Sequence, residues 1–554
     1  MSEQAIDETV DVLIVGGSLV GLSATVLLRG HGVDCLTVER HASTAIHPRA
    51  GHFQLRTMEI LRSAGLEQQV RRRSEEQYLP NGGINNVESL AGREIATYFD
   101  NLNAGVDELS PTIRTFIDQD ALEPILRERA QELGGRLRYR TECAALEQDA
   151  GGVTATLRDL DTGTERRLRT RYVIAADGNR SPARRRLGIA MHGHGLLSHS
   201  ITIYFRAQAD LAPLLHGRPH GVSYVTNPLL RGFFRLDRSG NRGFLVVNLV
   251  GDTARPEVVA AFASAPWERV AESIDEARAL QLLRAAIGVP EIPVTIDHVA
   301  TWRAEADSAE RYDAGRVFLA GDAAHVVPPN GGFGGNTGVQ DAHNLAWKLA
   351  FVLRGHAGRG LLDTYDAERR AIGELTVEQA YARYVHRVAP YLGLETAQPI
   401  IDDFSMEIGY RYESAAVVSE PGAPDGSHED PRTSKARPGS RAPHLELTLD
   451  GTAVSTLDLF GSELVLLAAG DPGGAWRTAG GEASDALGIP LAIRVGGEQG
   501  LADPGGLLGQ AYGIEGGGAV LVRPDGFVAW REHNAAAASA EALTSAMRAI
   551  LARD

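Results

Sequence analysis

The stretch Asp11-Val-Leu-Ile-Val-Gly-Gly-Ser-Leu-Val-Gly-Leu22 sets the fold of the N-terminal part of the chain. Its apolar run at 11–15 predicts a buried strand that stops at a glycine-rich turn, and the pattern of 19–29 predicts a helix. A second short strand is predicted over 33–39. A strand, turn, helix, turn and strand within this length imply two parallel strands joined by a right-handed crossover.

The turn of this unit is typical of a dinucleotide site. Small residues at Gly16 and Gly21 let the backbone approach a pyrophosphate, and the helix N-terminus offers N–H donors and a positive dipole end. Glu39 closes the second strand, where a carboxylate can accept hydrogen bonds from a ribose. Ser18 replaces the second glycine of the G-x-G-x-x-G pattern and fits if its φ is negative. A purely structural turn is the alternative to the predicted nucleotide site.

Composition bounds the class of protein. The chain has 554 residues, with 55 Lys and Arg against 71 Asp and Glu, a net charge of −16. This length suggests about three domains, and the acidic balance argues against nucleic acid as the main partner. Cys35 and Cys143 are the only cysteines, which excludes a disulfide framework or a cysteine-rich metal or iron–sulfur centre. We find neither a signal peptide nor an apolar run long enough to span a membrane, so we expect a soluble cytoplasmic protein.

The rest of the chain divides into segments that differ in composition and predicted secondary structure. Residues 200–300 are rich in β-type and aromatic runs, whereas 414–443 are rich in Pro, Gly, Ser and acidic residues and form the best candidate linker. Beyond it, 445–554 alternates short strands with helices. Helices are predicted over 55–72, 119–133, 256–286, about 339–354 and 363–388, a hairpin over 153–174 with its turn at 161–163, and a Gly/Pro-rich loop over 327–338.

Two later segments narrow the type of nucleotide. Ala175–Ser181, which reads AADGNRS, follows a predicted buried strand. A second strand at 316–320 runs into Gly321-Asp322-Ala323-Ala324-His325, two prolines and four further glycines. Each segment alone is an ordinary turn, but their order and separation after the first motif form a specific combination.

On these motifs the sequence resembles the single-component FAD-dependent aromatic hydroxylases, the p-hydroxybenzoate hydroxylase class. It looks closest to the branch that oxidises aromatic polyketides, such as aklavinone hydroxylase. The resemblance covers almost the whole chain and implies an α/β fold: a Rossmann-like FAD-binding domain, a β-rich substrate domain and a C-terminal thioredoxin-like domain. Further matching segments are Pro48–Ala50, Arg56–Arg62, Asn344–Lys348, Leu362–Tyr365, Arg437–Gly439, Ser455–Phe460 and Leu521–Gly526.

The resemblance also implies roles for particular residues. Gly16, Ser18 and Gly21 are expected at the FAD pyrophosphate, and Glu39 with Arg40 at the adenosine ribose. Gln119, which opens a helix after a strand, is expected to contact the cofactor, as are Asp177 and Gly178, which are also implicated in NADPH interaction. Asp322 is expected to bond the ribityl chain, with Pro329 and Gly332 beside the isoalloxazine ring and the helix starting near Asn336 pointing at the flavin. Arg49 lies on the loop that approaches the flavin in this class, or is a solvated loop arginine.

The family's chemistry explains why few catalytic side chains are expected. NAD(P)H reduces the FAD, O₂ forms a flavin C4a-hydroperoxide, and an electron-rich aromatic ring attacks the distal oxygen. The protein positions the ring, excludes water and favours a phenolate-like substrate. By resemblance, Tyr224 and Arg387 face the substrate, and Arg49 is the third candidate catalytic residue; for the first two, a core tyrosine and a surface arginine are the alternatives.

The function expected from the resemblance is hydroxylation of a polycyclic aromatic polyketide in antibiotic biosynthesis. A Baeyer–Villiger oxygen insertion on a related quinone, and inactivation or sequestration of an aromatic drug, stay open. His192, His194 and His199 are predicted to lie in a loop rather than in a metal site, and His325 near the flavin carries no sign of acid–base work. The cysteine-free C-terminal domain cannot perform thiol chemistry.

The predicted partners are the aromatic substrate and O₂, without nucleic acid or membrane, and the protein is expected to be a monomer or homodimer. The predicted division is an FAD-binding domain over 1–75, 105–190 and 290–400, a substrate-binding domain over 76–104 and 191–289, a linker over 414–443 and a thioredoxin-like domain over 444–554.

Overall fold

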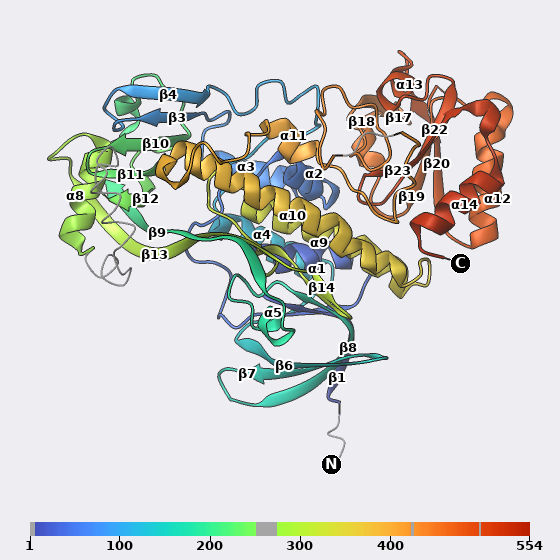
Figure 1. Ribbon diagram of the computed structural model, residues 1–554, viewed down its shortest axis with the longest axis horizontal. Helices are drawn as coiled ribbons and strands as arrows, with labels where there is room; N and C mark the ends of the chain where they lie inside the picture. The colour runs from blue at the N-terminus through green and yellow to red at the C-terminus, as the bar shows by residue number, and fades with distance from the viewer. Residues whose placement is uncertain (1–5, 251–273, 423–425, 498–499, 554) are drawn as a thin grey trace.

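The computed structural model describes residues 6–250, 274–422, 426–497 and 500–553. Three lobes lie in a row: a β-rich lobe, a central lobe that carries the N-terminus, and a C-terminal lobe (Figure 1). The long helices α9 (Phe333–Leu353) and α10 (Gly360–Arg387) run through the middle of this row. The part of the predicted 256–286 helix that precedes residue 274 lies outside the described residues; the remainder forms α8 (Glu276–Ile287).

The central lobe is built on a parallel sheet in the order β15-β8-β1-β2-β5. The predicted strands at 11–15 and 33–39 are confirmed, and Val12 of the first lies in register with Cys35 of the second. The predicted hairpin is confirmed: its two strands, β7 and β8, pair with each other, and β8 also pairs with β1 and β15 of this sheet. The strands are β1 (Glu8–Val15), β2 (Cys35–Val38), β5 (Arg136–Arg138), β6 (Thr141–Asp149), β7 (Gly152–Asp159), β8 (Glu165–Ala175), β14 (Asp313–Ala314) and β15 (Val317–Leu319).

Glycines allow helix α1 (Leu19–Gly30) to pack closely against α9. A Cβ on Gly338 would lie 2.5 Å from a methyl of Val20, and one on Gly335 would lie 3.0 Å from a methyl of Leu19. This packing explains why the prediction of a loop over 327–338 was wrong at its end: α9 begins at Phe333. Glycine disfavours a helix locally, but here the close contact with α1 outweighs that preference.

The single helix predicted over 55–72 is two helices, α2 (Leu55–Ser63) and α3 (Glu67–Gln77). Gly65, with φ +76°, ends the first of them, because the left-handed backbone there lets its N–H reach the carbonyl of Arg62. Helix α4 (Gln119–Glu132) matches its prediction, but a single bridge at Thr115, rather than a strand, precedes it.

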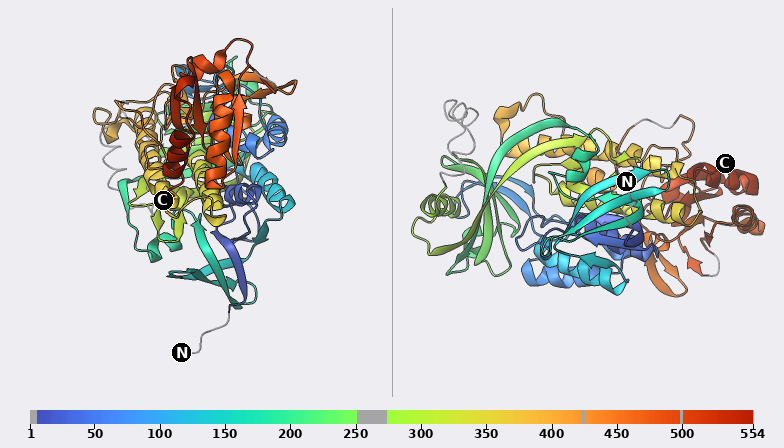
Figure 2. Two further views of the ribbon diagram at one scale, coloured as in Figure 1. Left: turned by 90° about the vertical axis from the view of Figure 1, so that its right-hand side faces the viewer. Right: turned by 90° about the horizontal axis from the view of Figure 1, so that it is seen from below.

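The β-rich lobe is a mixed sheet in the order β16-β13-β9-β12-β11-β10-β3-β4. Its longest strands, β9 and β13, extend from the central lobe into this sheet (Figures 1 and 2). The loop predicted for His192, His194 and His199 was therefore wrong: all three lie on β9, paired with the distant β13. The strands are β3 (Ile84–Val87), β4 (Glu94–Phe99), β9 (Met191–Ala207), β10 (Val222–Asn227), β11 (Leu230–Leu236), β12 (Arg242–Val250), β13 (Val294–Ala309) and β16 (His325–Val326).

The C-terminal lobe has a four-stranded sheet in the order β20-β19-β22-β23, with helices packed against it, as in a thioredoxin-like domain. Trp347 and Phe351 of α9 share a buried apolar cluster with Trp476 of this lobe. Its elements are β17 (Glu446–Leu449), β18 (Thr452–Ser455), β19 (Leu464–Ala468), α12 (Ala475–Leu487), β20 (Leu491–Val495), β21 (Leu501–Ala502), α13 (Leu507–Tyr512), β22 (Gly517–Val522), β23 (Val528–Asn534) and α14 (Ala540–Ile550).

The segment between α11 (Asp403–Ile408) and the C-terminal lobe is irregular and well packed. The described residues of 414–443 form bridges and turns instead of helices or longer strands, and Ala416, Ala436 and Ala442 are fully buried. Arg441 pairs with the buried Glu59 of α2 at 2.5 Å. The C-terminal lobe is therefore joined to the central lobe by buried polar contacts as well as by apolar packing.

Candidate active site

Two glycines of the first turn are packed too closely against neighbouring backbone to carry a side chain. A Cβ on Gly16, whose φ is +107°, would lie 2.2 Å from the carbonyl oxygen of Ala176, and one on Gly21 would lie 1.8 Å from that of Gly16. Ser18 has φ −95°, so the requirement for a serine at this position is met. Glu39 accepts hydrogen bonds from the N–H groups of Gly17 at 2.7 Å and His41 at 2.8 Å. Turn and carboxylate thus form one rigid unit, beside which Arg40 is exposed.

Glu123 of α4 binds the first turn and is the main residue of this region that the sequence analysis missed. Its buried carboxylate accepts hydrogen bonds from the Ser18 hydroxyl, from the Leu19 N–H at 2.9 Å and from the Ala45 N–H at 2.6 Å. Gln119, four residues earlier on α4, donates to it at 2.7 Å. The i, i+4 spacing on one helix face was the available signal. Glu123 joins the first turn to the loop that precedes Arg49.

Gln119 binds the same loop at Ala50, directly after Arg49. Its N–H donates to the Ala50 carbonyl at 2.9 Å, and its side-chain oxygen accepts from the Ala50 N–H at 3.2 Å. The Arg49 side chain is exposed, and its positive charge acts on Asp322. Gln119 and Arg49, far apart in the sequence, therefore lie at the same edge of the site.

Asp177 and Gly178 form a second turn, after β8. The Asp177 carboxylate accepts from the Ser181 hydroxyl at 2.5 Å and from the Ala183 N–H at 3.0 Å, so it stabilises the start of the short helix α5 (Pro182–Arg186). Burial raises the pKa of Asp177, although these hydrogen bonds oppose that effect. A Cβ on Gly178, where φ is +82°, would meet nothing within 4 Å. The backbone at Gly178 therefore has free space beside it, whereas the Asp177 carboxylate is bound to the start of α5.

Asp322 lies in a short 3-10 helix, Gly321–Ala323, directly after β15. Its side chain is exposed to solvent, yet the surrounding protein raises its pKa. Behind it, the buried Asp341 accepts from the Gly321 N–H at 3.0 Å and from His325 at 2.7 Å, and pairs with Arg369 at 2.8 Å. His325 is thus a buried partner of Asp341 that supports the Asp322 turn.

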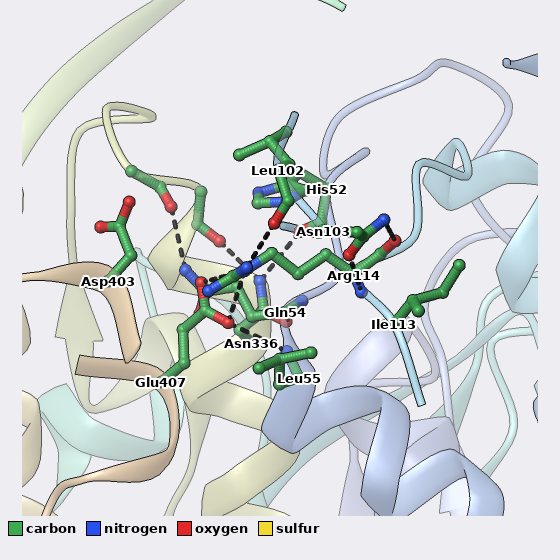
Figure 3. A network of polar contacts seen from close by, with 12 residues as sticks. His52, Gln54, Leu55, Leu102, Asn103, Ile113, Arg114, Asn336, Asp403 and Glu407 are labelled. Atoms are coloured by element: carbon green, nitrogen blue, oxygen red, sulfur yellow. Dashed lines mark hydrogen bonds and ion pairs between the residues drawn. The ribbon is translucent and has the colours of Figure 1, made fainter. Parts of the chain in front are cut away.

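The start of α9 is tied to the loop after Arg49 by Asn336 (Figure 3). Its side-chain oxygen accepts from the Gln54 N–H at 2.9 Å, and its amide donates to the carbonyls of His52 at 2.9 Å and Gly332 at 2.6 Å. Gly332, with φ +69°, precedes the helix, and its N–H donates to the Pro329 carbonyl at 3.0 Å. Asn336 therefore lies inside the first turn of α9, where its side chain clamps two loops.

A buried ion pair supports this clamp. Arg114 contacts both oxygens of Glu407 at 2.8 and 2.9 Å, and the same carboxylate accepts from the Leu55 N–H at 3.2 Å (Figure 3). Burial raises the pKa of Glu407 to about 7, against the lowering effect of Arg114. No sequence signal pointed to this pair, because its members are separated by nearly three hundred residues.

Tyr224 and Arg387, predicted to face the substrate, are brought together from different lobes. Tyr224 is buried on β10, and Arg387 is the last residue of α10. The Arg387 guanidinium lies 3.5 Å from the Tyr224 hydroxyl and 4.9 Å from the centre of the Tyr98 ring. Asn330, in the loop before α9, donates to the same hydroxyl at 3.3 Å. A phenol, a cation and aromatic rings thus meet beside the loop that carries Pro329 and Gly332.

Comparison with known proteins identifies the arrangement. An FAD binding domain family matches residues 9–380, and the C-terminal domain of aromatic-ring hydroxylases matches 435–553. The chain is 54% identical to 4-methyl-5-nitrocatechol 5-monooxygenase of a Burkholderia species over 99% of this chain and 98% of the relative. It is 40% identical to tetracenomycin A2 monooxygenase-dioxygenase of Streptomyces glaucescens over 99% and 97%.

This chain belongs to the FAD-dependent aromatic-ring hydroxylases. A crystal structure of aklavinone-11 hydroxylase with FAD and aklavinone superposes with a TM-score of 0.90 at 37% identity, covering 99% of this chain and all of that one. The predicted fold class, the FAD cofactor and the flavoprotein monooxygenase activity are confirmed by these matches. NAD(P)H as the co-substrate is typical of the family.

The residues of this hydroxylase fit an FAD molecule. The glycines of the first turn let its backbone pack tightly against β8 and α1, Glu39 closes β2 beside it, and the Asp322 side chain is exposed at the end of β15. Within the described part of the chain, no group of three or more histidine, cysteine or acidic side chains could hold a metal ion. Among the same residues, none of the helices combines the length and the apolar character of a membrane span.

Proposed function

We propose that this hydroxylase adds oxygen to a phenolic ring of a polycyclic aromatic polyketide in antibiotic biosynthesis. The observation that carries the proposal is the Tyr224–Arg387 pair, 3.5 Å apart, between the β-rich lobe and the end of α10. When the phenolic oxygen of the substrate lies beside the Arg387 guanidinium, the positive charge favours the ionised form of that phenol. An ionised phenol is richer in electrons at the ring carbons, which suits attack on an electrophilic oxygen.

The roles of the cofactor residues follow the same proposal. Gly16, Ser18 and Gly21 receive the FAD pyrophosphate, Glu39 and Arg40 the adenosine ribose, and Asp322 the ribityl chain. Gln119, Asp177 and Gly178 shape the loops around it, and Pro329, Gly332 and Asn336 hold the backbone beside the ring system. Bound FAD supplies the activation of O₂ after reduction by NAD(P)H. The chain's own residues position the substrate, exclude water and hold its phenolic oxygen near Arg387.

The relative at 54% identity favours a second candidate substrate. Its name describes a single aromatic ring with nitro and hydroxyl groups, whereas the relative at 40% identity is named for tetracenomycin A2. In a 4-methyl-5-nitrocatechol the hydroxyl on carbon 2 lies para to carbon 5, so its ionisation also enriches that carbon in electrons. The same Arg387 contact therefore serves a nitrocatechol, and the choice depends on which substrate class accelerates the enzyme.

The proposal is tested with the FAD-loaded protein and a panel of anthracycline and angucycline precursors and nitrocatechols. We expect one class to accelerate anaerobic flavin reduction by NADPH or NADH and to yield a product with one added oxygen on a ring carbon. A lactone carbonyl in the product spectrum would indicate Baeyer–Villiger insertion instead. If FAD is bound but no aromatic compound changes its reduction, sequestration of an aromatic drug gains support and the proposal is overturned for this panel.

The catalytic pair is tested by Tyr224→Phe and Arg387→Lys. Each is expected to lower kcat by about 10- to 100-fold, because a hydrogen bond to a charged group is worth about 1.5–3 kcal/mol, with FAD content unchanged. Tyr381→Phe is the matched control, since Tyr381 lies on the same helix as Arg387 and its hydroxyl donates to the Leu392 carbonyl at 3.4 Å, away from the Tyr224–Arg387 pair. Unchanged kcat in both variants would remove the pair from the mechanism.

The remaining assignments complete the proposal. We place the FAD-binding domain at 1–75, 105–190 and 290–400, the substrate domain at 76–104 and 191–289, the linker at 414–443 and the thioredoxin-like domain at 444–554. The enzyme works in the cytoplasm as a monomer or homodimer, without nucleic acid or membrane. The net charge of −16 supports the exclusion of nucleic acid, and sedimentation analysis decides the oligomeric state.

A further inference from the structure

Asn330 lies in the loop between β16 and α9, and only 1% of its surface is exposed. Its side-chain amide donates to the Tyr224 hydroxyl at 3.3 Å, which orients the amide group. Among the residues that the structure describes, the Asn330 side-chain oxygen has no hydrogen-bond partner. A buried acceptor without a partner is destabilising, so such an atom indicates where the donor of a ligand would bind.

The neighbouring Tyr224 hydroxyl is placed to donate a hydrogen bond. Its oxygen receives two donors, the Asn330 amide and the Arg387 guanidinium at 3.5 Å. A phenolic hydroxyl also has one proton of its own to donate. With both donors directed at its oxygen, this proton is available to an acceptor on a ligand. Asn330 and Tyr224 therefore offer an acceptor and a donor side by side, next to a positive charge.

The backbone around Asn330 is fixed. The Gly332 N–H donates to the Pro329 carbonyl at 3.0 Å, which closes a turn around Asn330. The Gln54 side chain donates to the Gly331 carbonyl, also at 3.0 Å. A group that is held in place before binding loses little conformational freedom when a ligand binds. The fixed Asn330 oxygen therefore favours ligands whose hydrogen-bond donor lies at one particular position.

Aromatic rings flank these polar groups. The rings of Tyr98 on β4 and Phe233 on β11 each lie 6.0 Å from the Tyr224 ring, at 86° and 54°. The Arg387 guanidinium lies 4.9 Å from the centre of the Tyr98 ring. Such rings suit a planar aromatic ligand, and the guanidinium suits an anionic oxygen on that ligand. The site therefore matches an aromatic ring that carries an ionised oxygen and a hydroxyl donor close together.

We propose that Asn330 selects substrates that carry two hydroxyls on adjacent ring carbons, a catechol arrangement. The ionised oxygen of the catechol pairs with Arg387 and accepts a hydrogen bond from Tyr224, and the neighbouring hydroxyl donates to the Asn330 side-chain oxygen. This inference rests on the proposed function, because it starts from the phenolic oxygen placed at Arg387. Asn330 is a specificity residue, which holds the ring and moves no proton. A monophenol leaves the buried Asn330 oxygen without a partner.

Binding without turnover tests the inference directly. The FAD-loaded protein is titrated by calorimetry, in the absence of NAD(P)H, with 4-nitrocatechol and 4-nitrophenol at a pH where both are monoanions. A polycyclic pair, 2,3-dihydroxyanthraquinone and 2-hydroxyanthraquinone, represents the larger substrates. We expect the Kd of the monophenol to exceed that of the catechol by about 5- to 50-fold in at least one pair, because the buried acceptor is then left unpaired.

Variants assign this preference to Asn330. Asn330→Leu keeps the approximate size of the side chain without the amide, so the ratio of the two Kd values is expected to fall to within about twofold. Asn330→Asp retains an acceptor, so the ratio is expected to stay above about threefold, although the added charge weakens the binding of both anions. Asn85→Leu is the matched control and is expected to leave the ratio unchanged. Asn85 is equally buried and has no hydrogen-bond partner among the described residues, but it precedes Asn86, the register partner of Tyr224, and so lies on the opposite face of the sheet.

The possible outcomes separate this inference from the proposed function. Equal Kd values within both pairs, or no binding of either catechol, would overturn the inference. Tighter binding of 2-methoxy-4-nitrophenol than of 4-nitrocatechol would contradict it as well, because Asn330 would then act as a donor. A wild-type ratio retained in Asn330→Leu would refute it by assigning the preference to another residue. Failure of every aromatic compound to be oxidised would refute the proposed function, whereas the titrations would still measure the preference for a catechol.

Discussion

Glu368 on α10 holds the C-terminal lobe to the central lobe through a fully buried charge cluster. Its carboxylate lies 2.7 Å from the Lys348 ammonium of α9 and 2.6 Å from the Arg523 guanidinium of the C-terminal lobe. Arg523 also pairs with Asp525 at 2.6 Å. The four ionised side chains carry two positive and two negative charges, so the cluster is neutral. Glu368→Gln keeps the shape of the side chain but leaves one uncompensated positive charge.

The expected effect is large because the charge has no access to water. Removing one partner of a buried ion pair costs about 3–5 kcal/mol of the free energy of unfolding. At about 2 °C per kcal/mol, the Tm of the FAD-loaded protein falls by roughly 6–10 °C. The C-terminal lobe contributes Arg523 and Asp525, so its docking is the contact that weakens.

The loss of Tm in Glu368→Gln is expected to depend on pH, through the protonation of Lys348. Burial lowers the pKa of Lys348 to about 8 in the wild type, and Glu368 and Asp525 oppose that effect. Without the Glu368 charge this pKa falls further, so in the variant Lys348 is neutral over a wider pH range. The folded variant then binds fewer protons than the unfolded chain, and stability rises with pH in that window. The Tm deficit of Glu368→Gln is therefore expected to be larger at pH 6 than at pH 9.

Scanning calorimetry of the FAD-loaded protein at these two pH values tests the prediction. Glu165→Gln is the control, because Glu165 pairs at 2.7 Å with Arg158 on the surface, where the side chains are 50% and 44% exposed. Loss of such an exposed pair costs less than about 1 kcal/mol. The reasoning would be refuted if Glu368→Gln and Glu165→Gln lowered Tm equally, or if the deficit of Glu368→Gln grew with pH.

Two further predictions concern the cofactor site. Asp322→Ala is expected to yield flavin-depleted protein, because the only carboxylate on the Gly321–Ala323 turn is lost; absorbance of the purified protein measures the FAD content, and full occupancy would contradict the proposed ribityl contact. Ser18→Gly is expected to leave the FAD affinity similar or tighter, because glycine replaces serine at a helix start at a cost of only a few tenths of a kcal/mol, and Glu123 keeps its bond to the Leu19 N–H. A large loss of affinity in an FAD titration would overturn the placement of the first turn.

Local sequence was sufficient for the first turn. The apolar strand, the glycines and the helix that follows are set by backbone sterics and periodicity within about thirty residues, so Gly16, Gly21 and Glu39 were predicted together. The same reasoning placed the end of α2 wrongly, because the left-handed turn at Gly65 interrupts an otherwise continuous helical pattern.

Tertiary packing overrode local preference at α9 and β9. Glycines after Gly332 indicated a loop, but their missing side chains let α1 approach, and the helix begins at Phe333. The histidines at 192, 194 and 199 showed no strand pattern of their own, because their backbone is extended by pairing with β13, a strand about a hundred residues later in the chain.

The sequence by itself determined the fold class and the glycine-rich turns, and through family resemblance it pointed to Tyr224 and Arg387. Only the tertiary structure decided which distant side chains meet: Ser18 with Glu123, Tyr224 with Arg387, and Glu368 with Arg523. The physical reason is the range of the interactions. Backbone conformation depends on near neighbours, whereas these contacts form only after sheets and helices from several parts of the chain have packed together.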